Sequence, residues 1–142
     1  MPLSGIIIIN GEILMKYILK NKPFAHWAKK LKITNCILLD VLNDMTHGLY
    51  EANLGGNVYK KRIPIGNRGK SGGARTIIAF KMQEKAIFIY GFSKNEKSNI
   101  TKKEEDALKA LAKIYFNYSD DQILKAIKAG ELIEVNYEKN NS

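Results

Sequence analysis

The chain has 142 residues, of which 45% are hydrophobic, and its 23 basic against 14 acidic side chains give a formal net charge of +9. With 3 prolines and 11 glycines, this composition excludes a collagen-like or largely disordered chain and predicts one globular domain. The single Cys36 cannot form an intrachain disulfide and no Cys/His cluster offers a zinc site, so we expect no cofactor and no metal. No window approaches the roughly 18 apolar residues of a membrane span, which favours a cytoplasmic protein with no membrane partner.

The positive charge is concentrated in one part of the sequence. Residues 57–97 carry 10 basic and 2 acidic side chains, whereas residues 1–56 carry 6 and 4, and residues 98–142 carry 7 and 8. If the lysines were spread over an ordinary solvated surface, the C-terminal segment 98–142 should also carry excess positive charge, and it does not. We therefore expect the central segment to bind a polyanion, with nucleic acid as the favoured candidate.

Residues 1–14 differ from the rest because they contain no basic residue and have an apolar run that ends at Asn10-Gly11. This pair of residues predicts a hairpin turn that returns the chain along a strand over residues 15–20. A competing interpretation is that translation naturally begins at Met15, so that residues 15–142 form a single domain behind an extension. The intact mass of the native protein distinguishes the two.

Two helices are predicted after this strand. Pro23 suits the first turn of a helix that runs to about Lys32, because the apolar residues that follow it recur at spacings of three and four. Thr34 is a suitable N-cap for a second helix, and Gly48 is a natural stop. The apolar stripes of the two helices contain Phe24, Trp27, Ala28 and Leu31, and then Ile37, Leu38, Val41, Leu42 and Met45.

Three strands are predicted next, over residues 58–65, 74–80 and 86–93, because these segments are rich in Ile, Phe, Tyr and Val. Residues 53–57 before them are expected to form a loop. Residues 81–85 are few enough for a hairpin connection. Because no helix separates the three strands, we expect them to pair antiparallel as a meander.

Two capping-box patterns, Thr101–Glu104 and Ser119–Gln122, each precede an apolar stripe and predict the starts of two C-terminal helices. Gly130 should end the second helix, and residues 131–137 alternate as an edge strand or a docked tail would. The order of elements predicts an α+β fold, with a small antiparallel sheet packed against the helices.

The strand over residues 58–65 places Lys60 and Arg62 on one face, since side chains alternate along a strand. In residues 66–75, four glycines bracket the cations Arg68, Lys70 and Arg75, and backbone N–H groups and cationic side chains could meet a phosphate there. Gly69-Lys70-Ser71 is not interpreted as a nucleotide-binding P-loop. The motif requires a glycine at position 64, where this chain has Pro64, and the segment leads into a strand instead of a helix.

A third basic stretch, residues 93–98, leaves the last strand of the meander. If the strands pair as expected, Lys94 and the basic residues of the two preceding segments converge on one site. This convergence is the functional hypothesis. The predicted helices carry His26 and His47 away from it, and we interpret both as surface or packing residues.

These segments resemble the RelE/HigB-like toxins of type II toxin–antitoxin systems, in the RelE/ParE superfamily. The resemblance covers residues 15–135 and rests on Arg-Gly-Lys-Ser-Gly-Gly-Ala-Arg at 68–75 and on Tyr-Gly-Phe-Ser-Lys-Asn-Glu at 90–96. It implies a small antiparallel sheet with two N-terminal helices packed on it. It also implies an endoribonuclease that cleaves mRNA on the ribosome, and a cognate antitoxin that is often a helix-turn-helix protein.

The resemblance also implies catalytic roles. Lys60 and Arg62 match basic positions that contact the scissile phosphate or activate the attacking hydroxyl, and Arg75 matches an arginine that stabilises the transition state. The chain departs from RelE proteins at Asn95, where they carry an arginine, and at Thr101, where they carry a tyrosine. We expect Lys94, together with Lys70, to supply the missing charge.

Cleavage without a metal uses the neighbouring 2′-hydroxyl as nucleophile, so that cations matter more than carboxylates. Residues 57–97 contain only two acidic side chains, which suits a two-metal nuclease poorly. Glu96 is a possible general base, or a local charge partner. Arg68 and Lys70, with Lys97 and a stacking Tyr90, are expected to bind RNA. Arg75→Ala should relieve growth arrest and change the free energy of unfolding by no more than about 1 kcal/mol, as at a surface position.

Two other classes of protein stay open on the sequence. One is a ParE-like inhibitor of DNA gyrase that is not a nuclease. The other is a nucleic-acid-binding module without catalytic activity. Mapping of mRNA ends after expression distinguishes the three.

Overall fold

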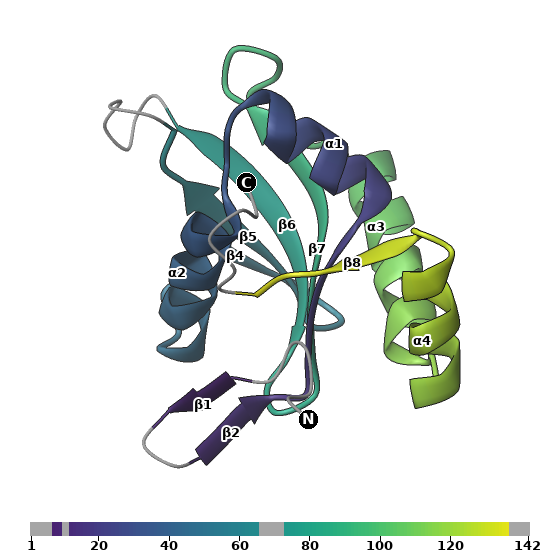
Figure 1. Cartoon of the computed structure of the whole chain (residues 1–142). Coiled ribbons are helices and arrows are strands. Elements are labelled where there is room, and N and C mark those ends of the chain that lie inside the picture. Colours follow the sequence, from purple (N-terminus) through teal and green to yellow (C-terminus); the bar gives the residue numbers. More distant parts are fainter. Residues whose placement is uncertain (1–6, 10–11, 66–72, 137–142) are drawn as a thin grey trace.

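The computed structural model describes residues 7–9, 12–65 and 73–136, and its main element is a twisted six-stranded sheet (Figure 1). The strands lie in the spatial order β4-β5-β6-β7-β3-β8. Their bounds in chain order are β3 (Tyr17–Asn21), β4 (Ala52–Gly55), β5 (Val58–Ile63), β6 (Ala74–Lys81), β7 (Lys85–Ser93) and β8 (Leu132–Glu134). The expected meander is confirmed, because β6 pairs antiparallel with both β5 and β7.

Helices cover both faces of this sheet, and Figure 1 shows α2 on the opposite side from α3 and α4. The helices are α1 (Lys22–Lys30), α2 (Asn35–Thr46), α3 (Lys102–Phe116) and α4 (Asp120–Lys128). One apolar core lies between the sheet and α1 and α2, around Phe24, Leu42 and Phe88. A second core lies between the sheet and α3 and α4, around Ile77 and Ala112.

The helix starts follow from capping side chains. Thr34 accepts a hydrogen bond from the Ile37 backbone N–H, as predicted. Both predicted capping boxes are also confirmed. The hydroxyls of Thr101 and Ser119 each accept from the backbone N–H three residues on, and their own backbone N–H groups donate to the side chains of Glu104 and Gln122. The first helix begins one residue before Pro23, with Asn21 as its N-cap.

Two parts of the expected fold are wrong. The sheet is mixed, because β3 pairs parallel with β7 while it pairs antiparallel with β8. The helices are also placed differently from the expectation, since α3 and α4 bury a second sheet face of their own. Chain-order reasoning missed the parallel pair because it joins strands that are separated by two helices and three other strands.

The N-terminal hairpin also pairs differently. β1 (Ile7–Ile9) pairs antiparallel with β2 (Glu12–Met15), so the return strand is not the one over residues 15–20. The two strands form a separate two-stranded sheet, which projects from one end of the molecule in Figure 1. The predicted turn at residues 10–11 lies outside the described residues.

The segment predicted as a loop at 53–57 contains strand β4, which pairs antiparallel with β5. Gly56 and Asn57 both have positive φ, +64° and +62°, which is the conformation of the tight turns that join two strands. Glycine and asparagine adopt this conformation at little cost, so the pair closes the hairpin. This turn positions the residues just before β4 beside the end of β5.

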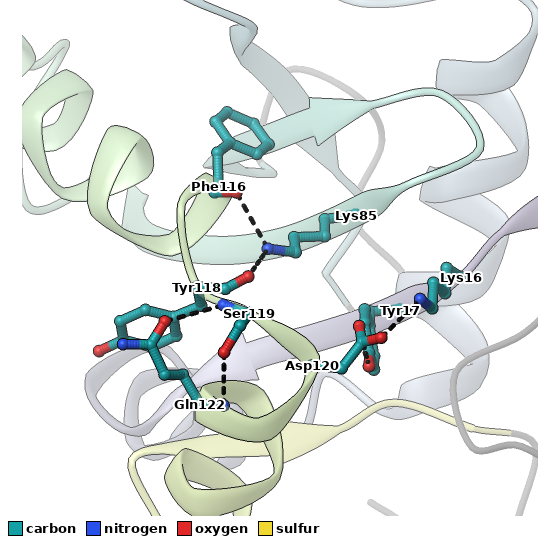
Figure 2. Close-up of polar contacts among 8 residues, drawn as sticks. All are labelled: Lys16, Tyr17, Lys85, Phe116, Tyr118, Ser119, Asp120 and Gln122. Atoms are coloured by element: carbon teal, nitrogen blue, oxygen red, sulfur yellow. Dashed lines mark hydrogen bonds and ion pairs between the residues drawn. The ribbon is translucent and has the colours of Figure 1, made fainter.

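The junction of α3 and α4 is tied to the sheet by Lys85, whose ammonium donates hydrogen bonds to the carbonyls of Tyr115, Phe116 and Tyr118 at 2.9, 3.1 and 2.7 Å. Figure 2 shows the contacts with Phe116 and Tyr118. The carbonyls of Tyr115 and Phe116 lie at the end of α3, where a positive charge is favoured by the helix dipole. Burial lowers the pKa of Lys85. Next to this contact, Asp120 accepts from Lys16 and from the Tyr17 hydroxyl, as Figure 2 also shows.

None of the helices in the described ranges is long and apolar enough to cross a bilayer.

Candidate functional site

Strand pairing brings together three cations that come from two neighbouring strands. Arg62 of β5 lies directly opposite Arg75 of β6, and Lys60 lies opposite Ile77. Ile77 belongs to the core beneath α3 and α4, so all of these side chains lie on that face of the sheet. We call Lys60, Arg62 and Arg75 the basic cluster. The predicted common face of Lys60 and Arg62 follows from this register.

The basic cluster is organised by Glu51, a residue that the sequence reasoning missed. The Glu51 carboxylate receives a hydrogen bond from Arg75 Nε at 2.7 Å and lies 3.6 Å from Arg62 Nε. Its oxygens are shared, with Oε1 toward Arg75 and Oε2 toward Arg62. Glu51 lies just before β4, outside the segment 57–97 that carries the excess of basic residues. Recognition of the Gly56-Asn57 turn could have found it, because that hairpin folds residue 51 back onto β5.

Arg75 is buried, which corrects the expectation that it occupies a surface position. Only 5% of its side chain is exposed, against 47% for Arg62 and 27% for Glu51. Its Nη1 atom is buried and finds no hydrogen-bond partner among the described residues. An arginine is always charged, and a buried donor without a partner is costly, so Nη1 is the donor of this guanidinium that an incoming acceptor would satisfy.

The strand β7 extends the site with aromatic residues. Tyr90 lies opposite Ile77, in the same row as Lys60, and Phe92 lies opposite Arg75. The two rings are 6.0 Å apart at their centroids. Phe92 is buried, whereas Tyr90 is partly exposed. Tyr90 is thus placed beside the basic cluster, two strands from Lys60.

The segment between β7 and α3 also reaches this face. Lys97 lies 5.7 Å from the centre of the Tyr90 ring and donates to the Tyr90 hydroxyl at 3.4 Å. It also forms an ion pair with Glu104, and the hydrogen bond in this pair raises the pKa of Lys97 and lowers that of Glu104. Lys60 donates to the Asn99 side chain at 3.2 Å.

Glu96 and Lys94 are placed differently from these residues. The Glu96 carboxylate accepts from the backbone N–H and hydroxyl of Ser93 and from Trp27 of α1. The Ser93 backbone hydrogen bond is the main cause that lowers the Glu96 pKa, which makes the carboxylate a weaker base. Lys94 is exposed and makes no hydrogen bond or ion pair with another described residue.

The remaining sequence candidates can be placed briefly. Arg68 and Lys70 lie outside the described residues. The Thr101 hydroxyl is occupied as the N-cap of α3. His26 and His47 are exposed, on α1 and at the end of α2, apart from the cluster. Within residues 7–9, 12–65 and 73–136, no group of three His, Cys, Asp or Glu residues is placed to hold a metal ion.

Comparison with known protein families gives one match. The model of the RelE toxin of the RelE/RelB toxin–antitoxin system matches residues 15–135, which include the whole basic cluster and Glu51. A comparison with curated proteins found no match.

Proposed function

Because the chain belongs to the RelE toxin family, we propose that it is the toxin of a type II toxin–antitoxin system and acts as an endoribonuclease that cleaves mRNA on the ribosome. The family match is to toxins in general, and the cleavage reaction is our inference from the cations on the α3–α4 face of the sheet. The family implies a RelB-type antitoxin as partner, and we propose a helix-turn-helix protein in that role. An enzyme that cleaves translated mRNA would work in the cytoplasm.

The observation that carries this proposal is the state of Arg75. Its guanidinium is buried, its Nε is held by Glu51, and its Nη1 donor has no partner among the described residues. A phosphate oxygen is the acceptor that fits such a donor, since charge-assisted bonds between guanidinium and phosphate are short and strong. Arg62, directly opposite on β5, can bind a second oxygen of the same phosphate.

The reaction that these groups favour is attack of a ribose 2′-hydroxyl on the adjacent phosphorus. A bond forms between O2′ and phosphorus, the bond to O5′ breaks, and the hydroxyl proton is removed while O5′ gains one. The intermediate phosphorane carries extra negative charge on its non-bridging oxygens. Arg75 and Arg62 would stabilise that charge, and one well-placed donor of this kind typically contributes roughly 10²–10³ in rate.

The other residues of the face are assigned to binding. Lys60 would contact the phosphate or lower the pKa of the attacking hydroxyl. Tyr90 offers a partly exposed ring on which a base can stack, and Lys97 and the exposed Lys94 can contact the RNA backbone. The hydrogen bonds of Glu96 give it a structural role instead, so we assign it no proton transfer.

Glu51 would act as a positioning residue for the two arginines. It contacts both guanidinium groups through their Nε atoms, at 2.7 Å from Arg75 and 3.6 Å from Arg62. Planar guanidinium groups fixed in this way lose little freedom when a phosphate binds. The carboxylate also offsets part of the positive charge while the site is empty.

Expression in growing bacteria, followed by primer extension on cellular mRNA, tests the function. We expect growth arrest and new mRNA ends at fixed codon positions with the wild-type protein. Arg62→Ala should abolish both, because it removes a guanidinium that we assign to the phosphate. Arg62 is half-exposed, so its loss should leave the fold intact. Lys102→Ala removes one exposed lysine from α3 and should act as wild type.

Two outcomes contradict the proposal. Growth arrest with supercoiling defects and no new mRNA ends would indicate a ParE-like inhibitor of gyrase. Unaffected growth at high expression, without the antitoxin, would indicate a binding module without catalytic activity.

A further inference from the structure

We propose that a pocket beside the basic cluster holds a guanine base of the RNA, next to the phosphate that is cleaved. The inference rests on the proposed function and adds a base preference to it. The pocket has a volume of about 600 Å³, within the range of roughly 300–1,000 Å³ that is typical of small-molecule sites. Its lining consists of Asp44, Leu49, Tyr50, Glu51, Lys61, Arg62, Ile63 and Pro64.

The pocket and the basic cluster share two residues. Arg62 and Glu51 line the pocket, and the same two side chains form the ion pair that leads to Arg75. Arg62 shares the face of Ile77, whereas Lys61 and Ile63 alternate with it along β5 and face α2, so the pocket lining comes from both faces of the strand. A phosphate bound to Arg62 would therefore lie against one side of this lining. Because phosphate and base of one nucleotide are joined by a single ribose, the base of a nucleotide held at Arg62 can enter the pocket.

The walls of the pocket suit the flat face of a base. Leu49 and Tyr50 are 57% and 40% exposed, which is unusual for large apolar side chains in this protein. The Tyr50 ring packs against the Tyr59 ring, with the two ring centroids 4.8 Å apart. Aromatic side chains of this kind stack on unpaired RNA bases.

The polar groups of the pocket suit the Watson–Crick edge of guanine. Asp44 and Lys61 form an ion pair at 3.0 Å, so a carboxylate lies beside an ammonium. Guanine presents the donors N1–H and N2–H beside the acceptor O6, and a carboxylate can accept the two donors while a lysine donates to O6. Adenine, cytosine and uracil do not place two adjacent donors next to an acceptor on this edge. The Asp44 side chain is 46% exposed and can be reached.

Binding of short RNAs tests the pocket apart from cleavage. The probe is a 5′-fluorescein tetranucleotide with a 2′-deoxy sugar at the attacked linkage, which prevents cleavage, and with each of the four bases in turn on either side of it. We expect the guanine probe to bind roughly tenfold tighter than the others, by fluorescence anisotropy. Asp44→Asn should remove this difference, and Tyr50→Ala should weaken binding of all four probes.

Matched control variants lie on other parts of the surface. Asp121→Asn changes an exposed aspartate of α4 that also pairs with a lysine, and Met82→Ala removes an exposed apolar side chain from the β6–β7 turn. Both should leave binding and base preference unchanged. Circular dichroism tests whether each variant is folded. If Tyr50→Ala does not fold, Tyr50→Leu provides a second test of stacking.

Mapping of the cut sites in translating cells gives the second measurement. We expect guanine at one fixed position next to the cut with the wild-type protein, and loss of that preference with Asp44→Asn while cuts continue. Cuts without a guanine preference, or a preference that survives Asp44→Asn, overturn the pocket. A wild-type protein that makes no cuts overturns the proposed function instead, and equal binding of the four probes would still overturn the pocket on its own.

Discussion

Lys85 and Arg75 are both buried cations of the same sheet, with relative exposures of 7% and 4%, yet their donors are used differently. Lys85 donates to three backbone carbonyls at the junction of α3 and α4, two of which are drawn in Figure 2. Arg75 has one carboxylate partner, shared with Arg62, and a buried Nη1 without any among the described residues. Satisfied donors stabilise the fold, whereas an unsatisfied one marks a place for a ligand.

The two regions also differ in how the protein meets the cost of burial. Burial lowers the pKa of Lys85, and its ammonium is held by three carbonyl dipoles, while the nearby charges of Glu84 and Asp120 act against this shift. At the basic cluster, Glu51 compensates two guanidinium groups that never lose their charge. A count of basic residues does not distinguish the two sites. They differ in whether each buried hydrogen-bond donor has a partner among the described residues.

Substitution of Arg75 should have the largest effect of the changes that separate these regions. Arg75→Lys keeps the charge and much of the volume but loses the planar fork that can hold Glu51 and a phosphate together. We expect the cleavage rate to fall by roughly 10²–10³, measured as the rate at which new mRNA ends appear after induction. The folded state should survive, as circular dichroism would show. A folded Arg75→Lys protein with full cleavage activity would contradict the assigned role.

Removal of the Lys85 ammonium should act on stability and leave cleavage unchanged. Lys85→Met leaves three carbonyls without their charged donor, and we expect the free energy of unfolding to fall by about 1–3 kcal/mol in chemical denaturation. Lys81→Met is the matched control, because Lys81 is half-exposed in a 3.7 Å pair with Glu84 and should contribute only about 0–1 kcal/mol. If Lys85→Met instead abolished cleavage while the protein stayed as stable as wild type, the two regions would not have separate roles.

The smallest expected effect is a pH dependence at the junction. Burial, together with the hydrogen bond to Asp120, raises the pKa of Tyr17 from 10.0 to about 12. A tyrosine with a raised pKa in the folded state stabilises the protein below pH 10 and loses that contribution as the pH rises toward 12. The stability difference between wild type and Tyr17→Phe should therefore be constant up to about pH 10 and shrink above it.

Denaturation curves at pH 8, 10 and 11.5 measure this difference. Comparison with Tyr17→Phe cancels the other tyrosines at the junction, Tyr115 and Tyr118, whose pKa values are also raised. A difference that stays the same at the highest pH would show that the Tyr17 proton does not contribute.

Features of the fold that depend on neighbouring residues could be predicted from the sequence. The N-caps at Thr34, Thr101 and Ser119 depend on a hydroxyl and a backbone group three residues away, so pattern and structure agree. The parallel pairing of β3 with β7 could not be predicted in this way. It depends on which face of the sheet each helix covers, and this is decided by packing between segments far apart in the sequence.

The candidate site shows the same division. Alternation along β5 was enough to place Lys60 and Arg62 together. The burial of Arg75 was not predictable, because it depends on Glu51 folding back through the β4–β5 turn. Glu96 lies at the right place in the sequence for a base, but its position in space is set by Ser93 and by Trp27, and the latter belongs to a distant helix.

The position of β3 between β7 and the edge strand β8 has a consequence for the order of assembly. Residues 17–20 pair with β7, and Asn21 pairs with Leu132, more than a hundred residues further along the chain. Contacts of such long sequence separation slow folding, because a large loop must close before they form. A newly made chain can close the β4–β7 meander early, but its sheet stays incomplete until the last strand has been synthesised. The complete six-stranded sheet can therefore form only after residues 132–134 have been released, long after β3 has been made.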